Sequence, residues 1–348
     1  MDFYIYGPKE DPYHRVKWTE PYPEQALNNF KDFHDTALKE GIRTYFSLSP
    51  GLSYGKNVKN DLRDLIAKIE QFLEIGYTDF AIFFDDIDAK KDIHLGHQHG
   101  EILTQVIKIL DRNNDNSLIF CPTVYCNRFS EGELKDSVYL RSLSNTIPEE
   151  IPLLWTGKEV VSETISNEDI ESLKSVIPNP VMIWDNYYAN DYCPNSLFIG
   201  PFKGRSVTDK TILGLGINPT GLPITDSIIL SQVKGLESTE KILKQYQVPD
   251  EFIHLLPFFS GPFDKVTSLE NLKEIERTKE FSQALCIEWK SDLQLEWSPF
   301  LWNFFIDLNL LQNLKEGMNK KTLEAWASRR YSNPLLKTIF FDKKDRGE

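Results

Sequence analysis

FAIFFDDID, at residues 80–88, is the stretch that indicates the fold of this chain most directly. An apolar run from Phe80 to Phe84 is followed at once by Asp85 and Asp86. Such a run is typical of a strand that is buried on both faces, as strands of parallel sheets are. In parallel α/β folds the carboxyl ends of the strands carry the functional side chains. We therefore expect two adjacent carboxylates at the functional edge of a parallel sheet.

Two adjacent acids at that edge can take different chemical roles if their surroundings push their pKa values apart. Acids also favour turns and helix starts, so the same pair could be a polar strand exit or a helix cap. The pair alone leaves both interpretations open.

Short β-rich runs and amphipathic helical segments alternate along the first two-thirds of the chain, with a repeat of about thirty to forty residues, which is typical of βα units. Gly41 and Gly76 end two of the helical segments, and Ser166 with Asp169 predicts a capping pair. The predicted strands are Phe3–Tyr6, Thr44–Leu48, Phe80–Phe84, Leu118–Cys121, Leu153–Thr156, Val181–Trp184 and Ile212–Ile217.

Seven βα-like units predict an α/β fold, a (β/α)8 TIM-type barrel that lacks its first strand. Three explanations for the missing first strand stay open, and a mis-assigned or truncated start ranks first among them. A natively open barrel ranks second, and third is that the late apolar run Leu336–Phe341 fills the gap. From about Gly235 the pattern changes to helix upon helix, so we predict a catalytic barrel over residues 1–234 and an α-helical domain over residues 235–348. The later helical stretches include Leu269–Trp289, Leu301–Leu314 and Leu323–Trp326.

Composition and charge narrow the class of protein. The 348 residues are 41% hydrophobic and 26% charged, which suits one large domain and a smaller one. The net charge of -13 disfavours nucleic acid and anionic membranes as partners. With no long uncharged apolar stretch and no basic leader, a cytoplasmic location is the default expectation. The four cysteines are too widely spaced for a disulfide framework, so we expect reduced thiols.

Every predicted strand ends in polar or aromatic residues. Because the ends of parallel strands meet at one edge, these side chains should converge there. Aromatic rings stack on the apolar face of a sugar while amides and carboxylates bind its hydroxyls, so the pattern favours a carbohydrate ligand.

At these strand ends the sequence resembles glycoside hydrolase family 84, the β-N-acetylglucosaminidases that include the protein O-GlcNAcases. The matching motifs follow the family's order over roughly residues 2–220, most of the barrel. They are YGPKED (6–11), LSPG (48–51), FFDDID (83–88), FCPT (120–123), LWTG (154–157), IWDN (183–186), ANDY (189–192) and GPFKGRS (200–206).

The resemblance implies a retaining mechanism without an enzyme nucleophile. The substrate's own 2-acetamido oxygen attacks the anomeric carbon and forms an oxazoline, a recognised exception to the two-carboxylate rule. By this resemblance Asp85 polarises the acetamido N–H and stays charged, while Asp86 is the general acid and then the general base. No cofactor and no metal are implied.

The resemblance also implies a set of substrate-binding residues. Each alone could have a structural role, since buried Trp and Cys are usually core residues and loop charges are usually solvated. They are Lys9 (a sugar hydroxyl), Tyr125 (the acetamido oxygen and scissile region), Asn186 and Asn218 (the acetamido group and a hydroxyl), Asp191 (the O4 and O6 hydroxyls), Trp184 (the N-acetyl methyl) and Cys121 (the pocket floor).

The chain departs from the family at its start, where the first strand and its Gly-Phe-Tyr-Gly-like loop are absent. The expected activity is hydrolysis of terminal β-linked GlcNAc, from a glycoside or an O-GlcNAc-modified protein. The alternative is a catalytically impaired GlcNAc-binding protein. An exposed sheet edge also allows two copies to pair as a homodimer.

Two further hypotheses stay open. His94, His97 and His99 have a spacing that could bind a metal together with Asp85, Asp86 or Asp88, which would indicate a metal-dependent hydrolase. Hyaluronidase activity shares the acetamido-assisted chemistry, but the acidic surface disfavours a polyanionic substrate.

Overall fold

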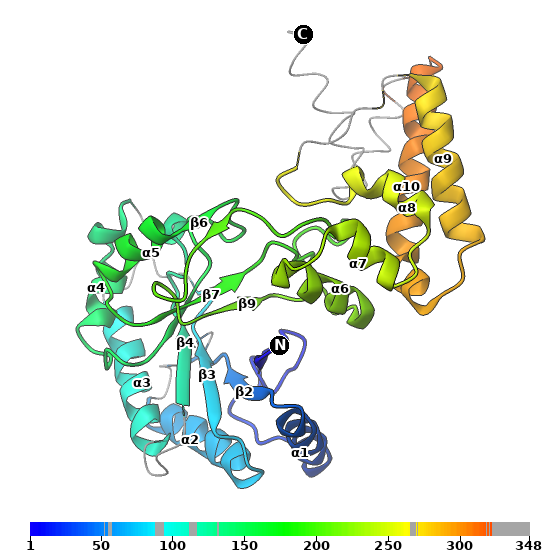
Figure 1. The fold of residues 1–348 in the computed structure, drawn as a ribbon. Coiled ribbons are helices and arrows are strands. Elements are labelled where there is room, and N and C mark those ends of the chain that lie inside the picture. Colours follow the sequence, from blue (N-terminus) through cyan, green and yellow to red (C-terminus); the bar gives the residue numbers. More distant parts are fainter. Residues whose placement is uncertain are drawn as a thin grey trace. The chain divides into compact units, whose positions relative to one another are not determined.

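The computed structural model describes residues 1–51, 53–54, 58–87, 94–110, 117–130, 132–264, 269, 271–317, 319 and 321. The chain divides into two compact units (Figure 1): Met1–Asp185 with Gly204–Gly216, and Asn186–Lys203 with Ile217–Glu348. Asp88 and the predicted segments Leu323–Trp326 and Leu336–Phe341 lie outside the described residues. The domain boundary predicted after residue 234 stays a prediction.

The first unit is an α/β structure whose seven strands run parallel and curl as a half-barrel, consistent with an incomplete TIM barrel. All seven predicted strands are confirmed, with ends shifted by at most two residues. In sheet order they are β1 (Phe3–Tyr6), β2 (Arg43–Leu48), β3 (Asp79–Phe83), β4 (Ser117–Cys121), β5 (Leu153–Trp155), β7 (Val181–Asp185) and β9 (Gly214–Ile217).

Helices connect the strands of this sheet, as a parallel arrangement requires. Ser166 and Asp169 form the predicted capping box at the start of α5. Two short strands not predicted from the sequence, β6 (Ile165–Ser166) and β8 (Arg205–Ser206), pair separately. The helices of this unit are α1 (Glu24–Lys39), α2 (Val58–Glu74), α3 (Leu95–Leu110), η2 (Asn127–Phe129), η3 (Leu134–Asp136), α4 (Val138–Ser144) and α5 (Asn167–Lys174).

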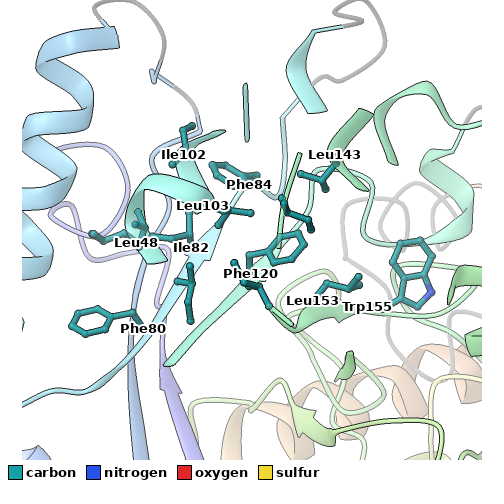
Figure 2. Close-up of a cluster of buried hydrophobic side chains, with 14 of the residues drawn as sticks. Leu48, Phe80, Ile82, Phe84, Ile102, Leu103, Phe120, Leu143, Leu153 and Trp155 are labelled. Carbon is teal, nitrogen blue, oxygen red and sulfur yellow. The ribbon is translucent and has the colours of Figure 1, made fainter. Parts of the chain in front are cut away.

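Side chains of the central strands alternate between two apolar layers. On β3, Phe80 and Ile82 pack in the layer between the sheet and the helices, whereas Ala81 and Phe83 belong to a smaller cluster on the opposite face. Figure 2 shows part of the helix-facing layer, with side chains from the strands and from α3 in contact. Fully burying one Phe contributes about 1.5–3 kcal/mol, so β3 is held firmly from both sides.

The two edges of the sheet, β1 and β9, approach each other through a side chain. A methyl group built on Gly216 would lie 3.5 Å from two ring carbons of Phe3, and one on Gly214 would lie 3.8 Å from a third. The aromatic ring of β1 thus packs over the glycines of β9. Within the described residues no strand hydrogen-bonds to both edges, so the contact there is made by a side chain.

The second unit is helical after Ile217, which confirms the predicted C-terminal helices. A separate apolar core, with Phe252, Trp297 and Leu301 among its fully buried members, holds the helices together. These helices are α6 (Pro223–Lys234), α7 (Thr239–Gln245), α8 (Asp250–Leu255), η4 (Leu256–Phe258), α9 (Leu272–Ile287) and α10 (Asp292–Lys315). No helix in the described part of the chain has the length and apolar character needed to cross a membrane.

The N-terminus of α6 is capped by a residue from α10. Leu222 at the N-cap position makes no side-chain hydrogen bond, and Glu296 accepts from the backbone N–H groups of Ile224 and Thr225, each at 2.9 Å. A carboxylate in this position satisfies donors that the helix cannot, and it opposes the helix dipole. Glu296 therefore joins α6 to α10.

We expect Glu296→Ala to lower the free energy of unfolding by about 1–3 kcal/mol, because it leaves the first N–H groups of α6 without an acceptor. Urea unfolding followed by circular dichroism measures the change. Glu276→Ala, at an exposed position of α9, is the matched control and should leave the unfolding midpoint unchanged. Equal midpoints for the two variants would contradict the capping role.

Candidate active site

Asp85 and Asp86 lie at the carboxyl end of β3, one residue beyond the strand, and they differ in environment. Asp85 is buried, with 8% of its surface exposed, and the Asp86 side chain is 39% exposed. Asp86 has a φ of 56°, in the left-handed region that non-glycine residues rarely adopt. Such backbone conformations cluster at functional sites, where surrounding structure holds them in place.

Two cations and a phenol surround these acids. Lys9 Nζ lies 2.6 Å from Asp86 Oδ2 and 4.0 Å from Asp85 Oδ2, and Arg15 Nη2 lies 3.6 Å from Asp86 Oδ2. The Tyr125 hydroxyl donates to Asp86 Oδ1 at 3.4 Å. The structure thus brings Lys9, Asp85, Asp86 and Tyr125 together as the sequence predicts. It adds Arg15, which the sequence analysis missed although this arginine lies in the same loop as Lys9.

The loop that carries Lys9 and Arg15 is anchored by Asp11. The Asp11 carboxylate accepts hydrogen bonds from the Tyr6 hydroxyl, the Tyr22 hydroxyl and the Tyr13 N–H, all at 2.8 Å. These bonds tie the loop to β1 and to the segment just before α1. The cations near the acids therefore come from a loop with a defined conformation.

The two acids have opposite pKa shifts. Burial raises the pKa of Asp85, and the charge of Asp86 raises it further. Burial also opposes ionisation of Asp86, but the hydrogen bond and charge of Lys9, with the charge of Arg15, outweigh this and lower its pKa. In the ligand-free protein the proton therefore favours Asp85, whereas the family roles require it on Asp86.

One oxygen of the pair is free to bind a ligand. Asp85 Oδ1 is buried and has no hydrogen-bond partner in the part of the chain that the structure describes. A buried polar atom without a partner is costly, so an N–H donor placed there would bind favourably. Such a donor would stabilise the ionised form of Asp85 and lower its pKa.

Cys121 and Trp184 belong to the apolar cluster on the inner face of the sheet. Cys121 is buried, and the pKa of its thiol lies well above the ordinary value because of burial and then the charges of Asp85 and Asp86. The centroid of the Trp184 ring lies 5.2 Å from the centroid of the Phe83 ring. Both side chains are therefore on the face at whose end the acids lie.

Asn186, Asn218 and Asp191 belong to the second unit. Asn218 Nδ2 donates to Asn186 Oδ1 at 3.1 Å, so the structure brings the two predicted amides together. The Asp191 carboxylate accepts from the Tyr192 N–H at 2.9 Å and lies in an exposed loop. Their roles toward a sugar stay predictions.

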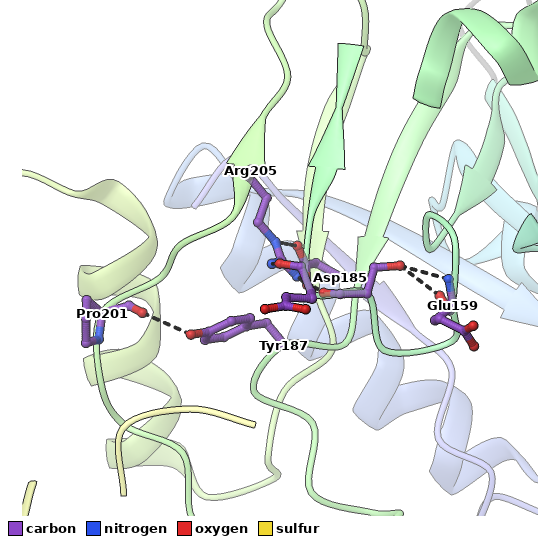
Figure 3. Close-up of polar contacts among 7 residues, drawn as sticks. Glu159, Asp185, Tyr187, Pro201 and Arg205 are labelled. Atoms are coloured by element: carbon purple, nitrogen blue, oxygen red, sulfur yellow. Dashed lines mark hydrogen bonds and ion pairs between the residues drawn. The ribbon is translucent and has the colours of Figure 1, made fainter. Parts of the chain in front are cut away.

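The end of β7, which carries Trp184, is held by a buried ion pair that the sequence analysis also missed. Arg205 binds Asp185 through Nε and Nη2, each at 2.6 Å, with 6% and 1% of the side chains exposed. Arg205 also donates to the Glu163 and Ser162 carbonyls at 3.0 and 3.1 Å. Figure 3 shows the guanidinium against Asp185. The pair joins two of the family motifs, IWDN and GPFKGRS.

The histidines proposed as metal ligands do not converge. His99 is buried and stacks on Phe84, with ring centroids 3.8 Å apart. His97 is exposed, with Nδ1 2.9 Å from Thr146 Oγ1 and Nε2 3.4 Å from Glu101. Across the described ranges no three His, Cys, Asp or Glu side chains are grouped to hold a metal ion. Asp88 lies outside those ranges.

Replacing Arg205 with Met should destabilise the protein by about 3–5 kcal/mol, because the Asp185 carboxylate is then buried without its partner. The double variant Asp185→Leu with Arg205→Met should be less destabilised than this single variant, since no buried charge is left. Denaturant unfolding monitored by tryptophan fluorescence measures both. Lys17→Met, at an exposed ion pair, should leave the unfolding midpoint unchanged. A double variant less stable than Arg205→Met would contradict the argument.

Comparison with known proteins agrees with this geometry. Residues 1–242 match the family described as NAGidase, beta-N-acetylglucosaminidase. The Protein O-GlcNAcases of Rattus norvegicus and Mus musculus are each 34% identical over 213 residues, 59% of this chain. The chain spans only 23% of the length of these curated relatives.

Solved structures match over most of the chain. An O-GlcNAc hydrolase of Thermobaculum terrenum aligns with a TM-score of 0.73 and 26% identity, covering 90% of this chain and 77% of that one. CpGH84B aligns with the same TM-score at 24% identity, over 91% of this chain and 65% of that one, and shares the fold. With the family match over residues 1–242 and the acids at the end of β3, this chain belongs to glycoside hydrolase family 84, the β-N-acetylglucosaminidases.

Proposed function

We propose that this chain is a retaining exo-β-N-acetylglucosaminidase that hydrolyses terminal β-linked GlcNAc, including O-GlcNAc on protein Ser or Thr. One observation carries the proposal: among the described residues the buried Asp85 Oδ1 lacks a partner, and the second acid beside it, Asp86, is contacted by Lys9, Arg15 and Tyr125. A 2-acetamido N–H is the donor that suits this oxygen.

In the first step Asp85 accepts a hydrogen bond from the acetamido N–H. The acetamido oxygen then forms a bond to the anomeric carbon while the glycosidic bond breaks. Asp86 gives its proton to the departing oxygen, and Asp85 stabilises the positive charge that develops on the oxazoline ring.

In the second step Asp86, now ionised, takes a proton from water. The water oxygen forms a bond to the anomeric carbon as the oxazoline opens and restores the acetamido group. Two inversions at that carbon give overall retention.

Substrate must reverse the order of protonation seen in the free protein. When Lys9 turns to a sugar hydroxyl, Asp86 loses the interaction that most favours its ionised form. When the acetamido N–H reaches Asp85, the ionised form of that acid is favoured. Both changes move the proton from Asp85 toward Asp86, so binding itself prepares the general acid.

The other residues complete the proposed sugar site. Trp184 and Cys121 form the wall and floor around the N-acetyl methyl group, Asn186 and Asn218 hold the acetamido group and a hydroxyl, and Asp191 accepts from the O4 and O6 hydroxyls. Two observations support these roles. Trp184 and Cys121 lie on the inner face of the sheet, and the Asn218 amide donates a hydrogen bond to the Asn186 amide.

The architecture that goes with this function is a (β/α)8 TIM-type barrel without its first strand, followed by a helical domain after residue 234. The partners are GlcNAc glycosides or O-GlcNAc-modified proteins, and a second copy of the chain at the open sheet edge. The net charge of -13 argues against nucleic acid and anionic membranes, and the proposed location is the cytoplasm.

The alternative is a GlcNAc-binding protein with impaired catalysis. The observation that favours it is the break between β1 and β9, where the Phe3 ring, and no strand among the described residues, makes the contact. An active enzyme should turn over an aryl glycoside, whereas a binding protein should bind it without turnover.

Turnover of a fluorogenic aryl β-N-acetylglucosaminide is the direct test. Asp86→Asn should lower kcat roughly a hundredfold to ten-thousandfold on substrates with poor leaving groups and much less on activated aryl substrates. Asp85→Asn should lower kcat on both, because it acts on the nucleophile. Wild-type rates in both variants would contradict the assignment.

The pH profile gives an independent test. The singly protonated pair is the active form, so kcat/KM should be bell-shaped, limited on the acid side by Asp86 and on the basic side by Asp85. The charge of Arg15 lowers the pKa of both acids. Removing it in Arg15→Met should therefore move both limbs of the profile to higher pH.

Two controls accompany the pH measurement. Arg15→Lys keeps the charge and should restore the wild-type profile. Lys17→Met removes a cation that pairs with Glu20 in the same loop and should leave both limbs unchanged. A profile for Arg15→Met that overlays the wild type would show that Arg15 does not act on the acids.

A further inference from the structure

A chain of hydrogen bonds behind the acids connects α3 and α4 to the ends of β3 and β4. His99 Nδ1 lies 3.0 Å from the Tyr139 hydroxyl, and that hydroxyl accepts from the Thr123 N–H at 3.0 Å. Thr123 Oγ1 donates to the Phe84 carbonyl at 2.7 Å. Phe84 immediately precedes Asp85, so the chain ends at the backbone of the catalytic pair.

Close packing of α3 on α4 makes this chain possible. A methyl group on Gly96 would collide with the Tyr139 carbonyl oxygen, and one on Gly100 would lie 2.5 Å from Thr146 Cβ. Glycine at these two positions therefore lets the helices approach closely enough for His99 to reach Tyr139. The histidine cluster that the sequence singled out lies in this same segment.

Burial decides the protonation state of His99 in this hydrogen-bond chain. Burial lowers the pKa of His99 to about 3, so its ring is neutral at working pH. The Tyr139 hydroxyl accepts from the Thr123 N–H, and it also shares a hydrogen bond with Nδ1 of His99, whose direction depends on the tautomer of the ring. The neutral histidine has no charge to give to the site.

The hydrogen-bond chain and its neighbours hold the backbone next to Asp85 from several sides. The Phe84 carbonyl accepts a hydrogen bond from Thr123 Oγ1. The Phe84 N–H donates to the Cys121 carbonyl at 2.9 Å, and the Phe84 ring stacks on His99. Thr123 also precedes Tyr125 by two residues in the loop after β4. Asp86 has a left-handed backbone, and such a conformation persists only where its surroundings are rigid.

We propose that His99 and Tyr139 are positioning residues, which act through Phe84 and Thr123 to hold Asp85, Asp86 and Tyr125 in the reactive geometry. The proposal rests on the proposed function. It assigns to His99 a part in orienting the acids in place of the metal binding that its sequence motif suggested.

The test compares His99→Phe and Tyr139→Phe with wild type in turnover of the aryl glucosaminide. His99→Phe keeps an aromatic ring against Phe84 but removes the nitrogen that bonds to Tyr139, and Tyr139→Phe removes the hydroxyl. Each should lower kcat roughly tenfold to a hundredfold with little change in KM, because a small displacement of catalytic groups costs about that much. His99→Asn, whose amide can donate or accept near the position of Nδ1, should recover most of the lost kcat.

His34 supplies the matched control. It lies on α1, is also buried, stacks on Tyr77 and has Nδ1 2.5 Å from Thr44 Oγ1 at the start of β2, the end of the strand opposite to the acids. His34→Phe should keep kcat within about twofold of wild type. The proposal is overturned if folded His99→Phe and Tyr139→Phe keep the wild-type kcat, if His34→Phe loses as much, or if His99→Asn recovers nothing.

A second readout does not depend on turnover. With ¹³Cγ-labelled aspartate, NMR titration follows the carboxyl groups of Asp85 and Asp86 in the ligand-free protein, assigned from the Asp85→Asn and Asp86→Asn spectra. His99→Phe and Tyr139→Phe should change these titrations, and His34→Phe should not; unchanged titrations in all three overturn the positioning role. A wild type that turns over no glucosaminide but shows the expected NMR changes would refute the proposed function and leave the positioning role supported.

Discussion

The burial of β3 on both faces is the constraint on which the rest of the site depends. Alternate side chains of this strand pack into two different apolar layers, so a shift by one residue would move Phe80 into the layer that holds Phe83 and Phe83 into the layer that holds Phe80. Its end is therefore fixed, and Phe84, Asp85 and Asp86 follow it. One of the two acids stays in the buried environment and the other turns outward. The difference in their pKa values follows from this difference in burial and from the cations that reach only the outer acid closely.

Electrostatics in the free protein favour the opposite protonation from the one that the proposed mechanism needs. Lys9 and Arg15 keep Asp86 ionised, and burial favours a proton on Asp85. A ligand with an N–H for Asp85 and a hydroxyl for Lys9 corrects both at once. Selectivity for a 2-acetamido sugar would then come partly from chemistry, because a sugar without the acetamido group leaves the proton on the wrong acid.

The supporting structure around the acids is polar and buried or partly buried, and it is distributed over distant parts of the chain. Asp11 anchors the loop with the cations, Arg205 secures the end of β7 through Asp185, and the bonds from His99 through Tyr139 and Thr123 reach Phe84. Each of these groups would be costly to bury alone, and each is paired. The bond from Thr123 holds the Phe84 carbonyl, one residue before Asp85 and two before the left-handed residue Asp86.

The sequence by itself determined the seven strands, the parallel sheet, the C-terminal helices and the place of the acid pair, because hydrophobic periodicity and the family motifs are local signals. It also predicted that Lys9 and Tyr125 would join the acids. It could not predict Arg15 beside Asp86, the Arg205–Asp185 pair, or the direction of the pKa shifts, since these depend on distances between residues far apart in the chain. The histidine motif shows the limit most clearly. Its spacing is compatible with a metal site, and only the close approach of α3 to α4 decided that His99 faces Phe84 and Tyr139.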